Sequence, residues 1–512
     1  MNKIINILFT VPLVWALASC YDDKGNYDYT ELDKVAISMQ DTVYATQFRT
    51  LELDADILFE GASEEDYTFN WRLWSNNIGG TNNKKEIGNK RKLSYNVEEI
   101  AGSYTLALTV TNKATEVNSY KTALLMVQSN ITEGLMVLHE KDGKSDFDLV
   151  MSPYFSQRVQ QDEILHNVYE TVNGEPLEGR GVSIGSYFSK GRYQDVTILT
   201  DKGGVRLSAF TMQRSYDMST LFTSLNNWKP ENYIFWNYYW SPGSEGYDAI
   251  ISNGHFYMYN PIGQLTGDFT TYTEPILKNG LTYKASPYVP KWIDMFANHG
   301  VIYDELAGRF LGVERSTWIL RPLPEATEVQ PFDWSNMHAT LRYMDTGYGK
   351  HEFGLFENWD SHELALYEFN FDVSPNIGVA KYPASHCPNL KDAKFYAVGD
   401  LGPLFMYADD RNLYRFDYNG SKNEEKLYTL QKADEKITGM QILKIYIDRF
   451  IPTHPFNNKI VLISTYNEST KEGKVYMYYI NVTNGAVDLS SEKVLDGFGE
   501  ILDMEWNYPK YI

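Results

Sequence analysis

The chain has 512 residues, of which 43% are hydrophobic and 15% aromatic, and its formal net charge is −21. This composition excludes wholesale disorder, because it supplies ample apolar surface for packed cores, and the length predicts two or more domains. The negative charge argues against nucleic-acid binding, because it would repel the phosphate backbone. The two cysteines are too few for a disulfide scaffold. These numbers favour an acidic, aromatic-rich, all-β protein.

Residues 1–19 are predicted to be a lipoprotein signal peptide. Lys3 gives a positive start, and the apolar stretch that follows is too short to span a bilayer. It ends in Leu17-Ala18-Ser19-Cys20, which resembles a bacterial lipobox. We therefore expect lipidation at Cys20, with several acyl chains giving stable anchoring in outer-membrane lipid. An ordinary signal peptide followed by a chance cysteine is the alternative.

Residues 20–34 are predicted to be an acidic tether. The stretch Tyr21-Asp22-Asp23-Lys24 and the residues after it show no apolar periodicity. The tether resembles the surface-export signal of lipoproteins in gut-type Gram-negative bacteria that use TonB-dependent nutrient uptake. The resemblance implies a lipid-anchored outer-membrane protein that faces the cell exterior, with a TonB-dependent transporter complex as a partner. A plain spacer on a periplasm-facing lipoprotein is the alternative.

Residues 35–128 are predicted to form a β-sandwich. Apolar residues at every second position from Leu51 to Ile57 are typical of a half-buried strand, and the pattern returns at 67–73 and 104–110. Strands of this length, separated by turn residues, favour an immunoglobulin-like sandwich.

Two segments in this domain point to a family. Gly102–Asn112 resembles a strand typical of PKD domains, and Phe69-Asn70-Trp71 lies where that family places its core tryptophan. The usual Asp/Gly-rich turn after the tryptophan is replaced by Arg72-Leu73-Trp74. The chain therefore resembles the PKD-like family of surface lipoproteins. The resemblance implies a spacer or interaction domain without catalytic residues, in which Trp71 belongs to the core.

Residues 129–512 contain a recurring element, a turn followed by a strand rich in Tyr, Phe and Leu. Regular strand groups at this period predict a β-propeller, because a single four-stranded blade cannot bury its faces alone. We count seven copies and predict seven blades; six or eight blades, or an array of two-sheet sandwiches, are the alternatives. The copies begin at Gly143, Gly204, Gly254, Gly308, His362, Arg411 and Gly473.

The two ends of this region predict how the ring closes. Gly134–Leu138 begins it as a middle strand, without an inner strand before it, and Ile437–Leu443 fits the inner strand of the seventh blade. The stretch Phe498–Trp506 is left over after that blade. We predict that it completes the first blade, so that no open sheet edge remains.

No motif predicts a catalytic residue, a metal ligand or a cofactor. Gly181–Gly185 matches the G-x-S-x-G nucleophile elbow, but a strand-like stretch follows it instead of a helix. His351-Glu352 and His362-Glu363 lack the second histidine of zinc proteases. Cys387 follows His386, but neighbours on a strand point to opposite faces, so a buried or idle thiol is favoured.

Aromatic residues provide the candidate ligand-binding residues. The segment 228–247 is unusually rich in tryptophan and tyrosine, whose faces stack on sugar rings. Core packing between blades is the alternative for most of them. Trp236, Tyr238 and Trp240 are the best candidates for exposure, and Trp334 with Trp359 forms a weaker second group.

These observations favour a non-catalytic surface lipoprotein that binds a polysaccharide or protein ligand as an accessory of a nutrient-capture system. A glycosidase or lyase is one alternative, because a propeller can take catalytic residues from several blades without leaving a linear motif. A structural docking or adhesion protein is the other. A pocket with converging carboxylates favours the enzyme, and an aromatic platform favours the binding protein. A flat apolar face favours the docking protein.

Overall fold

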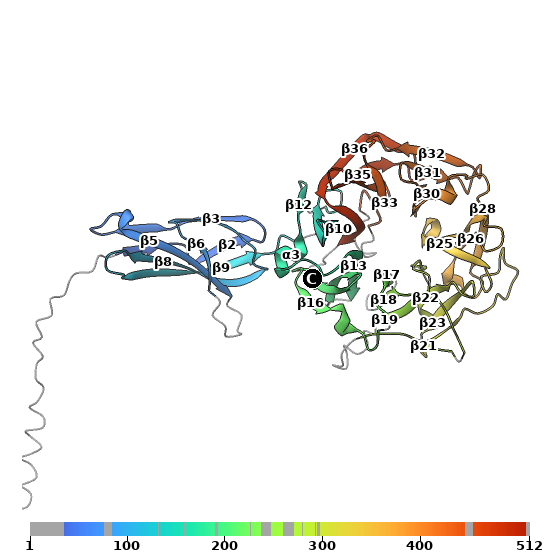
Figure 1. Cartoon of the computed structure of the whole chain (residues 1–512), viewed down its shortest axis with the longest axis horizontal. Helices are drawn as coiled ribbons and strands as arrows, with labels where there is room; N and C mark the ends of the chain where they lie inside the picture. The colour runs from blue at the N-terminus through green and yellow to red at the C-terminus, as the bar shows by residue number, and fades with distance from the viewer. Residues whose placement is uncertain are drawn as a thin grey trace, which may run out of the picture. The chain divides into compact units, whose positions relative to one another are not determined.

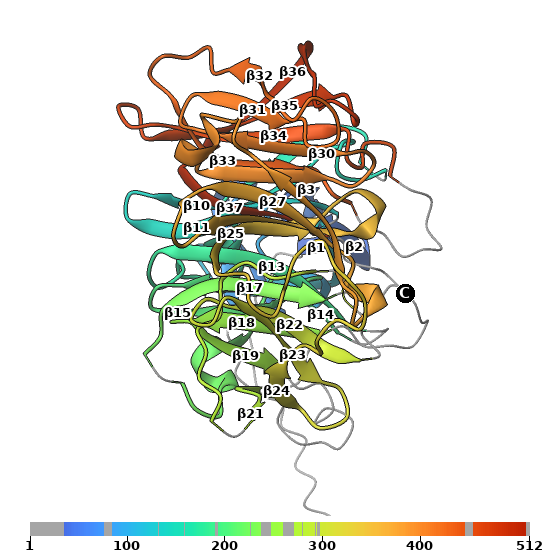
Figure 2. The ribbon, with the colours of Figure 1, turned by 90° about the vertical axis from the view of Figure 1, so that its right-hand side faces the viewer.

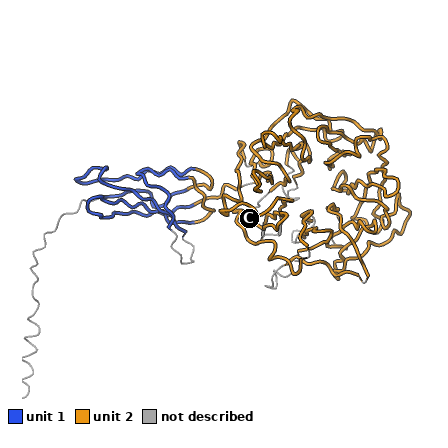
Figure 3. The backbone as a smooth tube through the Cα atoms, in the orientation of Figure 1, with its two compact units in different colours: residues 1–44, 50–95, 103–126 blue, residues 45–49, 96–102, 127–512 orange. Residues whose placement is uncertain are grey.

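A computed structural model describes residues 35–75, 84–131, 133–157, 159–189, 193–225, 227–236, 247–259, 271–278, 280–291, 293, 297–445 and 454–507. The chain divides into two compact units (Figure 3). The first comprises residues up to 44, 50–95 and 103–126; the second comprises 45–49, 96–102 and everything from Val127 onwards. Within the described ranges, no helix is long and apolar enough to cross a membrane.

The N-terminal strands form a small β-sandwich. One sheet has five strands in the order β2-β9-β8-β5-β6, and the pairs β1-β4 and β3-β7 lie outside it. Trp71 is fully buried, and its indole N–H donates to the carbonyl of Lys90 at 2.9 Å. The strands are β1 (Val35–Ser38), β2 (Thr42–Thr46), β3 (Thr50–Asp54), β4 (Asp56–Phe59), β5 (Tyr67–Ser75), β6 (Lys85–Gly88), β7 (Lys92–Asn96), β8 (Gly102–Asn112) and β9 (Asn118–Gln128), with the 3-10 turn η1 (Glu64–Asp66).

The second unit contains seven four-stranded sheets in the described residues, arranged as a ring (Figure 1). Blade 1 has β10 (Gly134–Lys141), β11 (Lys144–Met151), β12 (Glu163–Leu165) and β37 (Glu500–Asn507). Blade 2 has β13 (Gly181–Ser189), β14 (Tyr193–Thr200), β15 (Gly203–Ser208) and β16 (Arg214–Asp217). Blade 3 has β17 (Pro230–Trp236), β18 (Tyr247–Ser252), β19 (His255–Tyr259) and β20 (Tyr272–Thr273). Blade 4 has β21 (Ile276–Leu277), β22 (Asn298–Asp304), β23 (Arg309–Glu314) and β24 (Ile319–Pro322).

The remaining blades follow in chain order. Blade 5 has β25 (Ala339–Thr346), β26 (Glu352–Asn358), β27 (Leu364–Phe369) and β28 (Gly378–Pro383). Blade 6 has β29 (Phe395–Gly399), β30 (Leu404–Ala408), β31 (Asn412–Phe416) and β32 (Glu424–Thr429). Blade 7 has β33 (Lys436–Ile442), β34 (Ile460–Asn467), β35 (Glu472–Ile480) and β36 (Val487–Phe498). Short helical segments are α3 (Val168–Asn173), η2 (Met218–Leu221), η3 (Tyr348–Lys350), η4 (Phe371–Val373) and η5 (Leu390–Asp392).

The all-β fold and the seven-bladed propeller are thus confirmed. Each of the seven predicted elements begins at the turn before the third strand of a blade, namely β11, β15, β19, β23, β27, β31 and β35. Two of the turns show why glycine recurs at this place: Gly143 and Gly308 adopt φ of 77° and 62°, where a side chain would be strained.

Blade 4 departs from the regular pattern at its inner edge. Segment 284–291 lies where the other blades have their first strand: Ala285 forms an antiparallel bridge with Asp304, and Ser286 N–H donates to the carbonyl of Tyr303 at 2.9 Å. The outer place is taken by β21, which pairs parallel with β24. We call residues 284–291 the inner segment of blade 4.

The ring closes as predicted. Strand β37 pairs antiparallel with β10 from Gly134 opposite Asn507 to Glu140 opposite Glu500, and Figure 2 shows the two strands side by side. Strand β37 also contacts β13 and β33, the inner strands of the blades on either side. The C-terminal strand therefore completes the blade that the N-terminal strands begin, because it pairs the edge of β10 that would otherwise be open.

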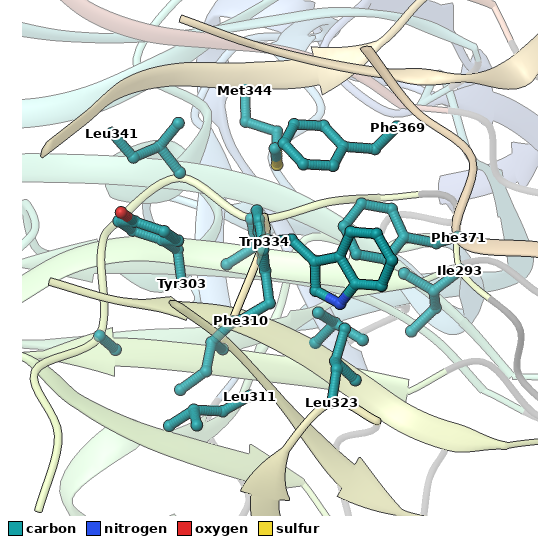
Figure 4. Close-up of a cluster of buried hydrophobic side chains, with 14 of the residues drawn as sticks. Ile293, Tyr303, Phe310, Leu311, Leu323, Trp334, Leu341, Met344, Phe369 and Phe371 are labelled. Atoms are coloured by element: carbon teal, nitrogen blue, oxygen red, sulfur yellow. The ribbon is translucent and has the colours of Figure 1, made fainter. Parts of the chain in front are cut away.

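Apolar cores fill the spaces between neighbouring blades. The largest core lies around blades 3, 4 and 5, and Figure 4 shows part of it, with Phe310, Phe369 and Phe371 close to Trp334. Between blades 2 and 3 the packing includes a buried ion pair, Arg206 with Asp248, whose side chains are 1% and 0% exposed. The Asp248 carboxylate also accepts from the hydroxyls of Tyr272 at 2.6 Å and Tyr233 at 3.0 Å.

Candidate functional site

The inner strands of several blades bring charged side chains together where these strands end. Asp345 lies near the end of β25, Lys444 follows the end of β33, and Glu505 lies near the end of β37. The inner segment of blade 4 ends at Lys291. Because the innermost strand of each blade runs in the same direction along the axis of the ring, these ends share one face of the propeller. We call Lys291, Asp345, Lys444, Asp503 and Glu505 the axial cluster.

The centre of the axial cluster is one carboxylate between two ammonium groups. Lys444 Nζ lies 2.7 Å from Asp345 Oδ2 and also donates to the carbonyl oxygen of Thr346 at 2.5 Å. Lys291 Nζ lies 3.3 Å from Asp345 Oδ1. The Lys444 side chain is 13% exposed, whereas that of Lys291 is 58% exposed. Lys444 is therefore held within the protein, whereas Lys291 reaches solvent beside the same carboxylate.

The pKa values follow from this arrangement. Burial alone would raise the pKa of Asp345, but the charges of Lys291 and Lys444 outweigh it and lower the pKa to about 2. In return, the Asp345 carboxylate raises the pKa of Lys291 above its ordinary value, against the effect of burial. Asp345 and Lys291 are consequently both ionised at neutral pH.

Two further carboxyl groups of the axial cluster have raised pKa values, in contrast to Asp345. Glu505 and Asp503 lie two residues apart on β37, hence on the same face of the strand. Loss of solvation raises the pKa of Glu505 to about 7 and that of Asp503 to about 6, although the charge of Lys291 lowers both. Glu505 is nevertheless accessible to solvent. An accessible but poorly solvated carboxyl is expected where other blades surround it, and not on an open outer surface.

Asp503 is held in place by the backbone. Its Oδ2 accepts from the N–H of Ile184 on β13 at 2.9 Å, and its Oδ1 accepts from the N–H of Met504 at 2.9 Å. Ile184 lies inside the G-x-S-x-G sequence, which the structure places within strand β13 and not on a strand-to-helix turn. The motif is therefore part of the wall around the axial cluster and has no nucleophile-elbow geometry.

Three tyrosines lie beside the axial cluster, one each from the inner edges of blades 4, 5 and 6. The rings of Tyr288 and Tyr343 meet edge to face at a centroid distance of 5.9 Å, and those of Tyr343 and Tyr396 stack at 5.4 Å. Each ring is partly exposed. The Tyr343 hydroxyl donates to Asp345 Oδ2 at 3.3 Å, which joins this tyrosine arc to the charged groups.

Trp236 was predicted to be exposed for ligand binding, and this expectation is wrong. The side chain is 1% exposed in the core between blades 3 and 4, and its indole N–H donates to the carbonyl of Pro290 at 2.8 Å. Asn232, also on β17, donates to the carbonyl of Pro287 at 2.8 Å. Together these two bonds fix the inner segment of blade 4. Trp236 therefore positions Lys291 indirectly, because its indole bonds the carbonyl of Pro290, the residue directly before this lysine.

Trp334 was also predicted as a ligand-binding residue, and the structure contradicts the exposure this role needs. Its side chain is 2% exposed and packs near Ile293, Leu323 and Phe371 (Figure 4). Within the part of the chain that the structure describes, the indole N–H has no hydrogen-bond partner. Apolar neighbours from blades 4 and 5 explain both facts, since they offer the ring a core but no acceptor.

Trp359 is partly exposed but belongs to a different place. Its indole donates to Thr340 Oγ1 at 3.0 Å, and its ring meets that of His338 edge to face at 4.7 Å. Both partners lie at the start of β25, whereas Asp345 lies near the end of this strand. The structure therefore does not bring Trp359 to the axial cluster. Tyr238, Trp240 and Cys20 lie outside the described residues.

The inner strands also border a hollow of about 330 Å³ at their opposite ends, around the starts of β29, β33 and β37. Its charged side chains are already paired with neighbours: Lys394 with Asp410 at 2.8 Å, Glu500 with Arg180 at 3.0 Å, and Lys436 with Glu468. We favour the axial cluster as the functional site, because Lys291 and Glu505 keep accessible polar groups there, whereas the charged side chains of the hollow are held in ion pairs.

The second cysteine and the histidines add no further site. Cys387 is 5% exposed, and burial raises the pKa of its thiol to about 12, so thiolate chemistry is disfavoured. Across the residues with described positions, no group of three or more His, Cys, Asp or Glu side chains is arranged to hold a metal ion.

Sequence reasoning missed all five members of the axial cluster and the tyrosine arc. They come from five different blades, so no linear spacing connects them. The one available signal was position: Asp345, Lys444 and Glu505 are each charged residues at or just after the end of an inner strand. A lysine or carboxylate at that place cannot be solvated from a blade interface and has to face the axis of the ring.

Comparisons with known proteins gave one family match and several similar solved structures. Residues 20–181 match the model of the PKD-like family, which is about a third of the chain. A quinoprotein alcohol dehydrogenase-like protein from Bacteroides thetaiotaomicron has a similar structure, with a TM-score of 0.50 and 12% identity, over 94% of this chain and 100% of that one. Sqt1 from Saccharomyces cerevisiae aligns over 78% of this chain and 98% of its own, with 12% identity and a TM-score of 0.30. No curated protein matches the chain. At such identity the first likeness supports the fold alone.

Proposed function

We propose that this protein is a surface-anchored lipoprotein whose propeller binds a carbohydrate at the axial cluster. The observation that carries the proposal is the tyrosine arc beside the axial cluster, joined to it by the bond from Tyr343 to Asp345. A sugar presents an apolar ring face and a rim of hydroxyl groups that both donate and accept. Tyrosine rings pack against the first, and ammonium and carboxylate groups bind the second.

The N-terminal part supports the anchoring half of the proposal. The segment ending in Leu17-Ala18-Ser19-Cys20 has the form of a lipobox, and the PKD-like match begins at residue 20, where the mature chain would start. Acylation of Cys20 would tether the chain to the outer membrane, and the acidic residues after it favour export to the outer surface. In this proposal the PKD-like domain is a spacer, and the propeller delivers its ligand to a TonB-dependent transporter.

A carbohydrate-active enzyme is the second candidate, and one specific observation favours it. Asp345 is ionised over the whole neutral range, whereas Glu505 is half protonated near pH 7. Two carboxyl groups whose surroundings push their pKa values apart are the pattern of a general acid with a base or nucleophile. The binding function remains the first proposal because sugar recognition needs only the donors, acceptors and ring faces described above.

Binding and release of sugar, measured together, test both candidates. The chain from residue 21 onwards is incubated with an array of host and dietary polysaccharides, and bound glycan and new reducing ends are quantified. Tyr396→Ala removes the ring at one end of the tyrosine arc. Tyr216→Ala is the matched control, because Tyr216 is 52% exposed on β16, the outer strand of blade 2.

The outcomes separate the functions. Binding without release, lost in Tyr396→Ala and kept in Tyr216→Ala, supports capture. New reducing ends that disappear in Glu505→Gln support the enzyme. If neither binding nor release occurs on any glycan, the proposal is wrong, and a role as a docking protein for another macromolecule takes its place.

A further inference from the structure

We infer that the N-terminal sandwich carries a second binding surface, on which a neutral, linear polysaccharide lies along strand β9. This inference goes beyond the proposed function, in which the PKD-like domain is a spacer, and it does not depend on the axial cluster. It is argued from the absence of charge on one face of the five-stranded sheet, from the exposure of two tyrosines and from the register of β2 against β9.

One face of the five-stranded sheet carries no charged side chain over three neighbouring strands. Alternate residues of these strands, such as Val43, Leu108 and Leu125, are buried in the sandwich core, so the residues between them point outwards. The outward positions of β2, β8 and β9 hold mostly threonine, with tyrosine, serine, asparagine, glutamine and a few apolar residues. We call the outward side of these three strands the uncharged face.

Other exposed parts of the same unit are charged, as expected for a chain in which 22% of the residues are charged. On the pair of strands β3 and β7, Glu52 and Lys92 point outwards and pair at 2.9 Å. On β5, next to the uncharged face, Arg72 is exposed, and Lys84 Nζ lies 4.7 Å from the ring centroid of Trp74. The uncharged face is therefore a distinct surface, and its composition suits a ligand without charge.

Two tyrosines stand out from the uncharged face. Tyr44 on β2 is 68% exposed and Tyr120 on β9 is 75% exposed. Among the residues with described positions, no other aromatic ring packs on either of them. Both rings are therefore open to a ligand, and a tyrosine offers a large apolar surface together with a hydroxyl group.

The register of β2 against β9 gives the length of the surface between these tyrosines. Two backbone bonds fix it, from the Leu124 N–H to the carbonyl of Asp41 at 2.8 Å and from the Gln47 N–H to the carbonyl of Gln128 at 2.9 Å. Because the residue numbers rise together, the strands run parallel, and Tyr44 lies beside Met126. From Tyr120 to Met126 the strand rises about 20 Å. A ligand that touches both tyrosines is therefore long and extended.

The side chains between the tyrosines favour a polysaccharide over other long ligands. Thr122 on β9 and Thr109 on β8 carry hydroxyl groups, which both donate and accept, as the hydroxyl groups of a sugar do. A protein partner is disfavoured, because threonine is under-represented at the residues that contribute most to protein binding. A charged polymer is disfavoured as well, because the face holds no opposite charge. A neutral polysaccharide matches both the hydroxyl groups and the open rings.

Affinity electrophoresis in native gels tests the inference on the chain from residue 21 onwards, whose negative charge drives its migration. The neutral probes are glucomannan, mixed-linkage β-glucan, xyloglucan and pullulan; polygalacturonate and heparin are the anionic ones. Tyr44→Ala and Tyr120→Ala each remove one exposed ring. Leu58→Ala is the matched control, because Leu58 is 59% exposed on β4 of the same sandwich, outside the uncharged face. Thermal unfolding verifies that all variants are folded.

We expect at least one neutral polysaccharide to retard the wild type. Each tyrosine variant should weaken the affinity by about fivefold or more, and Leu58→Ala should leave it unchanged. If no neutral probe retards the chain, the inference is wrong. Equal retardation of the wild type and both tyrosine variants also overturns it, and if Tyr396→Ala then abolishes the retardation, the proposed function still stands.

Two other occupants of the uncharged face have their own readouts. Retardation by polygalacturonate or heparin that Tyr120→Ala abolishes would show a charged ligand and overturn the inference. Sedimentation velocity detects a second copy of the chain: a wild-type dimer that Tyr120→Ala dissociates would make the face a contact between copies, and the inference would fail.

Discussion

Phenylalanine substitutions of the buried Trp236 and Trp334 lose similar packing, so the difference in stability between the two variants reports on the hydrogen bonds of the two indole groups. Both side chains lie in the same core, at 1% and 2% exposure, and replacing either with phenylalanine removes the same atoms. They differ in one bond. The indole of Trp236 donates to the carbonyl of Pro290 at 2.8 Å, whereas the indole N–H of Trp334 has no partner among the described residues.

The magnitude follows from this difference. Trp236→Phe leaves the buried carbonyl of Pro290 without its donor, which costs about 1–3 kcal/mol beyond the packing loss. Trp334→Phe removes a buried N–H that is already unsatisfied, which returns a penalty of similar size. Trp236→Phe should therefore lower the free energy of unfolding by about 2–6 kcal/mol more than Trp334→Phe does. For a unit of this size that corresponds to a melting temperature about 2–7 °C lower.

Differential scanning calorimetry is the appropriate assay, because fluorescence would change with the loss of either tryptophan and because a chain of two units need not unfold in one transition. Hydrogen exchange gives a second measurement: Trp236→Phe should speed exchange in the inner segment of blade 4, which ends at Lys291, and Trp334→Phe should not. If Trp334→Phe destabilises the propeller as much as Trp236→Phe, the reasoning from the two indole groups is wrong.

Three further predictions test other parts of the propeller. Arg206→Met should cost about 3–5 kcal/mol of stability, because it leaves the Asp248 carboxylate buried without its cation. Breaking the exposed pair of Lys394 with Asp410 should cost less than about 1 kcal/mol. Thermal unfolding of the two variants measures this difference. The pKa of Asp503 is raised to about 6 in the folded chain, from an ordinary value of about 3.9, so its stabilising contribution is complete below about pH 4 and is lost as the pH rises through about 6. The side chain of Asp503→Asn cannot ionise. The difference in melting temperature between this variant and the wild type should therefore shift in favour of the variant between about pH 4 and about pH 7; a constant difference over this range would contradict the assignment. In the chain from residue 21 onwards, Cys387 should not react with a thiol reagent such as DTNB until the chain is unfolded in urea, because the group is buried and its pKa is raised to about 12.

The fold could largely be predicted from the sequence, because it depends on local repetition. Alternating strands and a turn recurring from Gly143 to Gly473 predicted the blades, and the unpaired stretch after Phe498 predicted the closing strand. The irregular inner edge of blade 4 was less accessible, since segment 284–291 has no strand periodicity and is held by bonds from Trp236 and Asn232 of the blade before it.

The sequence analysis placed Trp71 correctly in a core but predicted exposure for Trp236 and Trp334, which are buried. An aromatic residue next to a strand can face solvent or a neighbouring blade, and composition does not distinguish the two. Trp236 and Trp334 face neighbouring blades, where large rings fill the wedge between twisted sheets. The partly exposed rings beside the axial cluster belong instead to three tyrosines that stand far apart in the chain.

By itself, therefore, the sequence determined the class of the protein, the number of blades and the way the ring closes, because hydrophobic periodicity is a property of neighbouring residues. Only the tertiary structure brought Lys291, Asp345, Lys444 and Glu505 together from four blades. The physical reason is that a propeller assembles its axis from one inner edge per blade. Residues about 50 positions apart or more become neighbours there. Their charges therefore shift one another's pKa values only after the ring has closed.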